Sequence, residues 1–91
     1  MNASDLIDLL GGTSAVARMA GVTPPTAHAY RYRGIPPERC PAIERATEGA
    51  HTVEALRPDV TWSRIADPAW PHPAGRPVID VARPAAVQEV V

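Results

Sequence analysis

The sequence of 91 residues contains no lysine and no phenylalanine, and its only cysteine is Cys40. A single thiol cannot form an internal disulfide, nor can it build a structural zinc site. His28, His51 and His72 lie too far apart in the sequence for a metal motif. No apolar run approaches the roughly 20 residues that span a bilayer, and no glycine-rich phosphate loop is present. We therefore expect a small protein with no metal, no cofactor and no membrane segment, and we expect no enzymatic activity.

The sequence also lacks a secretion signal and a strong net charge. The first residues lack a basic segment followed by an apolar run, so we expect no signal peptide and a cytoplasmic protein. The net charge is −1, which gives no indication of nucleic-acid binding by itself. However, residues 11–33 contain Arg18, Arg31 and Arg33 and no Asp or Glu. This distribution favours a basic face on a nearly neutral protein.

Short apolar segments separated by glycine or proline predict five helices before residue 62 and no strand among them. In the first helix, Leu6, Leu9 and Leu10 form the expected apolar face, and Gly11 ends the helix. Cys40 is expected to be buried, and Trp62 is expected to fold back onto the core. The expected helices cover about residues 5–10, 14–20, 24–33, 41–48 and 53–57. Their expected N-terminal caps are Ser4, Thr13 or Ser14, Thr23, and Thr52.

The composition changes after residue 63, where many of the eleven prolines are found. Residues 1–63 are therefore predicted to form the folded domain and residues 64–91 a proline-rich C-terminal arm. Within the arm, "PVIDVA" alternates apolar and polar residues as one short strand would. A lone strand needs a partner, which a second subunit could provide. The alternative interpretation is a tail without stable structure.

The spacing of small and apolar residues in residues 13–30 predicts a helix-turn-helix. This motif needs a small residue where its two helices touch, a glycine at the turn, an apolar residue after it, and two inward positions on the second helix. All of these requirements are met at the correct spacing. The predicted core of the motif consists of Ala17, Gly21, Val22, Ala27 and Tyr30.

The chain also resembles the Cro/YdaS-like regulators of phages and prophages. The resemblance covers residues 6–62 and is carried by "GG" before the second helix, by "GIPPERCPAIERAT" and by "LRPDVTW". It implies a lambda-repressor-like domain that binds operator DNA, usually as a dimer, and represses transcription. Some members of the family are described as antitoxin-like. Two departures concern the motif itself: Thr13 replaces a common Gln, and Pro24 and Pro25 follow Thr23 where Ser-Gln is often found.

The outward face of the expected third helix offers few polar groups. Prolines are tolerated in a first helical turn, but Pro24 and Pro25 remove two N–H groups from the helix end. His28 and Tyr32 can hydrogen-bond, whereas the two prolines and Ala29 offer only apolar contact, which suits a thymine methyl. The predicted base-contacting residues are Thr23, Pro24, Pro25, His28, Ala29 and Tyr32. The predicted phosphate-contacting residues are Thr13, Ser14, Thr26, Arg31 and Arg33.

The sequence therefore predicts an all-α fold, a small five-helix lambda-repressor-like domain with a proline-rich C-terminal arm that could hold one short strand. The predicted function is that of a phage- or prophage-encoded repressor, which binds double-stranded operator DNA as a homodimer through its third helix. The alternative is a protein-interaction module that retains the fold. Such an antitoxin, anti-repressor or anti-activator would contact a toxin or another regulator.

Overall fold

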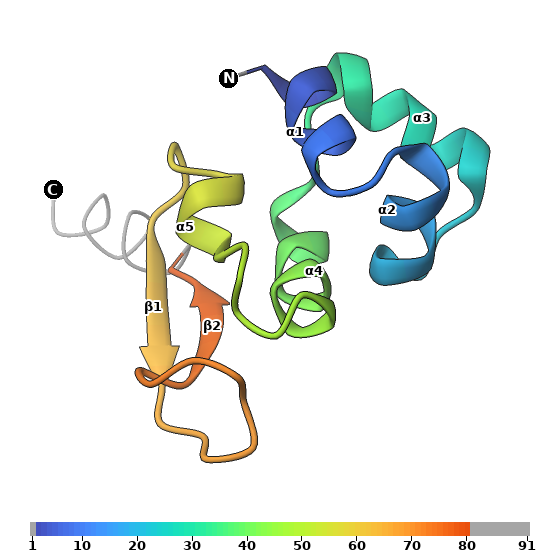
Figure 1. Cartoon of the computed structure of the whole chain (residues 1–91). Helices are drawn as coiled ribbons and strands as arrows, with labels where there is room; N and C mark the ends of the chain where they lie inside the picture. Colours follow the sequence, from blue (N-terminus) through green and yellow to red (C-terminus); the bar gives the residue numbers. More distant parts are fainter. Residues whose placement is uncertain (1, 81–91) are drawn as a thin grey trace, which may run out of the picture.

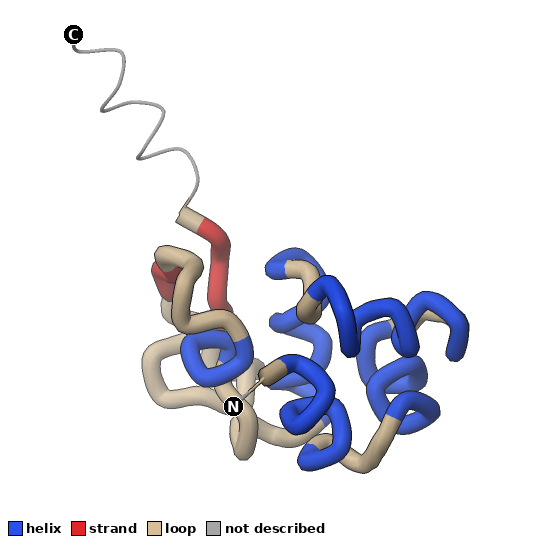
Figure 2. The backbone as a smooth tube through the Cα atoms, turned by 90° about the horizontal axis from the view of Figure 1, so that it is seen from above, coloured by secondary structure: helices blue, strands red, loops and turns tan. Residues whose placement is uncertain are grey.

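Helices form one part of the molecule and a two-stranded hairpin forms the other (Figures 1 and 2). The computed structural model describes residues 2–80. Five predicted helices are present: α1 (Ala3–Leu9), α2 (Thr13–Ala20), α3 (Pro24–Arg33), α4 (Cys40–Ala46) and α5 (Val53–Leu56), with a 3-10 turn at Pro37–Arg39. Strands β1 (Trp62–Ile65) and β2 (Arg76–Ile79) pair antiparallel. The prediction of an all-α fold is therefore wrong in this one respect.

The first helix differs from its prediction in its cap and in its buried face. Asn2 rather than Ser4 caps α1, and its Oδ1 accepts a hydrogen bond from the Asp5 N–H at 2.8 Å. Ile7 is fully buried, whereas Leu9, which we expected on the apolar face, is 57% exposed. Successive helical residues turn by about 100°, so the side chains of Leu9 and Ile7 point in nearly opposite directions.

The N-terminal ends of α2 and α3 determine which side chains of these two helices face outward. Gly12 precedes α2 without a side-chain cap, so the prediction that Thr13 or Ser14 caps this helix is wrong. Thr23 caps α3 as predicted, because its Oγ1 accepts a hydrogen bond from the Thr26 N–H at 3.4 Å. This cap fixes where α3 begins and therefore which of its residues face outward.

One hydrophobic core collects apolar side chains from all five helices and from Ile35 between α3 and α4. Cys40 is fully buried there, as predicted, and its burial raises the pKa of the thiol to about 12. The thiol therefore stays protonated and unreactive. Trp62 packs against this core from β1. The buried apolar residues are Ile7, Leu10, Val16, Ala17, Ala20, Ala27, Tyr30, Ile35, Cys40, Ile43, Val53 and Leu56.

The hairpin lies partly within the predicted C-terminal arm. Strand β1 runs across the domain boundary that we expected after residue 63, and its register pairs Arg64 with Pro77 and Ile65 with Arg76. The predicted strand thus finds its partner in the same chain; residues 81–82 of its motif lie outside the described residues. Gly75 closes the hairpin at φ +101°, and a Cβ there would lie 2.0 Å from the Ile65 carbonyl oxygen. Only glycine fits this position.

Glu44 of α4 is a fully buried carboxylate that joins the helices to the hairpin. Its Oε1 accepts hydrogen bonds from the Val53 N–H at 2.9 Å and from Arg64 Nη2 at 2.7 Å. Its Oε2 accepts from Arg64 Nη1 at 2.8 Å and from Trp70 Nε1 at 2.6 Å. Arg64 also donates to Glu54 and to the Gly75 carbonyl. A single side chain thus binds α5, β1 and the hairpin loop.

The pKa of Glu44 reflects these partners. Burial alone would raise it, but the hydrogen bonds from Arg64, Trp70 and the Val53 N–H lower it from 4.5 to about 2. The carboxylate therefore remains charged in the interior, and its charge is matched by the guanidinium of Arg64. A buried charge without such a partner would be strongly unfavourable.

We predict that Glu44→Ala lowers the free energy of unfolding by about 3 to 5 kcal/mol, because it leaves the Arg64 guanidinium without its buried partner. Glu54→Ala is the matched control, since Glu54 pairs with the same arginine but its side chain is 50% exposed. That control should lose less than about 1 kcal/mol. Urea unfolding followed by circular dichroism measures both values, and equal losses would contradict the role assigned to Glu44.

The lowered pKa of Glu44 also predicts the acid response of the fold. Because the folded-state pKa is below the ordinary 4.5, its contribution is complete above that pH and is lost as the pH falls toward 2. Urea midpoints measured from pH 6 to pH 2 should therefore decline less steeply for Glu44→Gln than for the wild type. Glu54→Gln serves as the control, with a smaller effect. Identical pH dependence in wild type and Glu44→Gln would disprove this assignment.

Candidate nucleic-acid interface

Helices α2 and α3 are joined by a tight turn at residues 21–23. Gly21 adopts the left-handed conformation at φ +73°, and the N–H groups of Gly21 and Val22 both donate to the Ala17 carbonyl at 3.0 Å. Ala17 is buried, and the two inward positions of α3, Ala27 and Tyr30, are buried as well. Val22 is half-buried against the core. The small side chain at Ala17 leaves room for the two helices to cross closely (Figure 1).

The opposite side of α3 faces outward. Tyr32 is the most exposed large apolar residue there, with 79% of its surface accessible, while Ala29 is half-buried. The exposed residues of the cap and of α3 are Thr23, Pro24, Pro25, Thr26, His28, Tyr32 and Arg33. The structure thus gathers all six predicted base-contacting residues on one surface, which we call the α3 face.

The tip of the α3 face has little hydrogen-bonding capacity left for a ligand. Pro24 and Pro25 occupy the first two helical positions and have no N–H groups. The N–H of Thr26 donates to Thr23 Oγ1, and the hydroxyls of these two threonines lie 2.9 Å apart in a hydrogen bond. The tip is therefore mainly an apolar surface.

His28 and Tyr32 form the polar part of the α3 face. They are one helical turn apart, with a Tyr32 hydroxyl to His28 Nε2 distance of 3.4 Å. Their rings meet edge to face, with centroids 5.5 Å apart. Both side chains can exchange this contact for a base edge or a phosphate, because both are exposed.

Arg31 is bound within the protein, although we predicted that it contacts phosphate. Its Nε donates to Thr13 Oγ1 at 3.1 Å, and its Nη1 donates to the hydroxyl and carbonyl oxygens of Ser4 at 2.9 and 3.3 Å. Its Nη2 forms an ion pair with Asp8 at 2.9 Å. Arg31 therefore fastens α3 to α1 and α2, and it engages the hydroxyl of Thr13, another predicted phosphate contact.

Two other arginines of the basic segment remain available. Arg18 on α2 and Arg33 at the end of α3 are exposed and have no hydrogen bond or ion pair within the described residues. Ser14, at the start of α2, is exposed as well. The positive charge available to an anion thus comes from Arg33 on the α3 face and from Arg18 on the neighbouring α2, since the Arg31 charge is matched by Asp8.

Sequence reasoning missed the internal role of Arg31 and the buried role of Glu44. Arg31 and Arg33 look equivalent in the sequence, but a helix separates residues two apart by about 200°, so they face different surroundings. The helical period could have signalled this difference, because Arg31 follows the inward Ala27 by four residues. No local signal identifies Glu44, whose partners Arg64 and Trp70 are 20 and 26 positions away.

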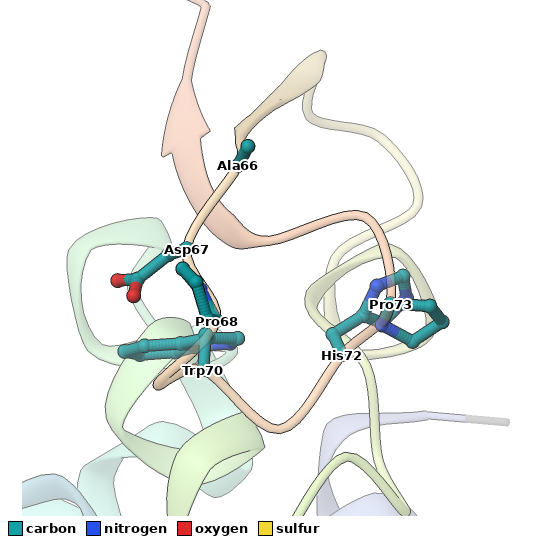
Figure 3. A pocket seen from close by; sticks show the side chains of 6 residues that line it. All are labelled: Ala66, Asp67, Pro68, Trp70, His72 and Pro73. Atoms are coloured by element: carbon teal, nitrogen blue, oxygen red, sulfur yellow. The ribbon is translucent and has the colours of Figure 1, made fainter.

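A hollow of about 480 Å³ lies in the hairpin loop and is lined by Pro68, Trp70, His72 and Pro73 together with Ala66 and Asp67 (Figure 3). Asp67 accepts a hydrogen bond from the Ala69 N–H and lies 3.9 Å from Arg76. The carboxylate of Asp67 thus serves the hairpin, whereas the indole N–H of Trp70 is bound by Glu44. In residues 2–80, no group of His, Cys, Asp or Glu could hold a metal ion, and no helix is long and apolar enough to cross a membrane.

The crossed helices, the left-handed glycine and the outward α3 face define a helix-turn-helix protein. Residues 4–65 match the family described as "Bacterial toxin YdaS", and the chain belongs to this family. The matched segment ends with β1, so β2 and the hairpin loop lie beyond it.

Two relatives are similar to this chain over about two thirds of its length. One is "Putative transcriptional regulator YdaS" of Escherichia coli (strain K12), which is 53% identical over 59 residues, or 63% of this chain. The match spans 60% of the length of that relative. The other is the Cro protein from a prophage element, Xfaso 1, of Xylella fastidiosa strain Ann-1. Its structure is 46% identical with a TM-score of 0.55, over 67% of this chain and 97% of that chain.

The two arginines at the end of α3 should respond differently to removal. Arg31→Ala deletes the contacts to Thr13, Ser4 and Asp8 and should lower the free energy of unfolding by about 1 to 3 kcal/mol. Arg33→Ala is the control and should change it by less than about 0.5 kcal/mol, since it has no partner to lose. Urea unfolding measures both, and a larger loss in Arg33→Ala would reverse the assignment.

Proposed function

We propose that this protein is a DNA-binding transcriptional regulator, a Cro-like repressor that occupies operator DNA with α3 in the major groove. The observation that carries the proposal is the α3 face, which is outward, free of carboxylates and held rigidly from behind by Ala27, Tyr30 and Arg31. An α-helix presented in this way fits the major groove, which is about 12 Å wide. The names of the relatives, a regulator and a Cro protein, support the same role and a function without catalysis.

Each predicted contact has a specific part in the proposal. His28 and Tyr32 hydrogen-bond base edges, while Pro24, Pro25 and Ala29 provide apolar contacts. Thr23 contacts a base edge through its hydroxyl, while Arg33 and the hydroxyls of Thr13, Ser14 and Thr26 contact phosphates. Arg18 is not among the predicted contacts, but its exposed guanidinium binds a further phosphate. We withdraw Arg31 from the phosphate contacts, because its donors are engaged with α1 and α2.

A homodimer completes the proposal. One α3 face offers few hydrogen-bond donors and one available guanidinium, that of Arg33, and α2 adds only Arg18, so one copy should bind DNA weakly. Two copies on half-sites about one helical turn apart, roughly 34 Å, would convert weak contacts into specific binding. The proposed setting is the cytoplasm of a bacterium that carries the phage or prophage.

A protein-interaction module is the second candidate function. It is favoured by the tip of α3, where prolines and paired threonine hydroxyls leave few donors for DNA. In this case the α3 face would contact a protein, such as a toxin or another regulator. The two candidates differ in whether DNA is bound at all.

We predict that Arg18→Ala and Arg33→Ala each weaken binding to all duplexes alike and reduce the slope of log K against log salt by about 1, because each removes one phosphate contact. His28→Ala should in addition relax the preference at one base position. Fluorescence anisotropy with duplexes selected from a random library measures both effects. The selected sequence should be two-fold symmetric.

Arg76→Ala is the control for the loss of charge, since it removes an exposed arginine from β2, on the far side of α4 from α3 (Figure 1). Its affinity for DNA should equal that of the wild type. Absence of salt-sensitive binding to any selected duplex would reject the repressor and favour the protein-interaction module.

A further inference from the structure

A hollow on the α3 face lies between α3 and the segment that leads to α4. Its volume is about 380 Å³, and its lining includes Pro25, Ala29, Tyr30 and Pro36, with Arg33 beside them. No carboxylate lines it. Pro25, Ala29 and Arg33 are spaced four residues apart, so they follow one another along one side of the helix. The hollow is therefore an apolar surface with a cation at its end.

Donors that could bind the polar edge of a base are scarce around this hollow. Pro25 has no N–H, and Ala29 contributes only a methyl group. Thr26 also lines the hollow, but its N–H and hydroxyl are both engaged with Thr23. The guanidinium of Arg33 has no partner in the described residues. A fitting ligand must therefore present an apolar group to Pro25 and Ala29 and an anionic group to Arg33.

The major groove of DNA offers this combination at pyrimidines that carry a C5 methyl. Thymine and 5-methylcytosine present a methyl group in the groove, whereas uracil and cytosine present only a hydrogen at the same place. The phosphates of the strand border the groove, within reach of an arginine at its edge. An apolar hollow beside a free guanidinium complements both groups.

We infer that the hollow lined by Pro25, Ala29 and Pro36 reads the C5 methyl of one pyrimidine in each half-site, while Arg33 holds a phosphate beside it. The inference rests on the proposed function, because it requires α3 to lie in the major groove. The same site then distinguishes 5-methylcytosine from cytosine. Methylation of DNA at this position thereby becomes a signal that the protein detects.

The test replaces each thymine of the selected duplex by uracil, one position at a time, and measures the dissociation constant by fluorescence anisotropy. One position in each half-site should lose about fourfold in affinity when its methyl is removed, the effect of one buried methyl. At that position, a pair of 5-methylcytosine with guanine should bind about fourfold more tightly than a pair of cytosine with guanine.

Two matched variants locate the contact. Pro25→Ala removes ring carbons from the hollow, so the ratio of the uracil to the thymine dissociation constants should fall toward 1. Pro68→Ala makes the same chemical change at an exposed proline of the hairpin loop, which has no part in the proposed DNA contacts, and should retain the ratio. Circular dichroism verifies that both variants keep their helices.

The outcomes separate this inference from the proposed function. Specific binding that is equal for thymine and uracil duplexes overturns the inference and leaves the repressor proposal intact. Failure to bind any duplex, even at low salt, overturns both. A methyl effect that survives Pro25→Ala places the contact elsewhere on α3, and the assignment to this hollow is then wrong.

Discussion

The buried carboxylate of Glu44 is the constraint on which the arrangement of the helices and the hairpin depends. A charge in the interior is tolerated only when donors surround it, and here the donors come from α5, β1 and the hairpin loop. Residues 62–76 therefore cannot move away from α4 without exposing or unpairing this charge. The hairpin and the helices consequently form one folding unit, although their sequences differ so strongly in proline content.

Arg31 plays the corresponding part on the other side of the molecule. It donates hydrogen bonds to the hydroxyls of Thr13 and Ser4 and forms an ion pair with Asp8. It therefore holds α1, α2 and α3 together behind the α3 face. Two groups of residues support the α3 face from behind: Arg31 with its polar partners, and Ala27 and Tyr30 in the core. A rigid helix is well suited to reading DNA, because little ordering entropy is lost on binding.

The sequence predicts well what depends on near neighbours. The turn at Gly21, the cap at Thr23 and the five helices follow from residues within one or two helical turns. Prediction failed locally at the caps of α1 and α2 and at Leu9, and it also failed where distant residues decide. The hairpin forms because β1 meets a strand some ten residues later, and Glu44 is buried because Arg64 and Trp70 reach it. The base and phosphate contacts stay predictions. The fold brings the predicted base-contacting residues together on the α3 face, but their contacts depend on DNA.

The internal ion pair of Arg31 has a consequence for non-specific binding to DNA. Attraction to arbitrary DNA grows with the number of unpaired cations, and the pairing of Arg31 with Asp8 removes one of three from the basic segment. Under the proposed function, this pairing weakens the attraction of the protein to DNA that lacks its target sequence. A larger share of the protein would then remain free to reach that target.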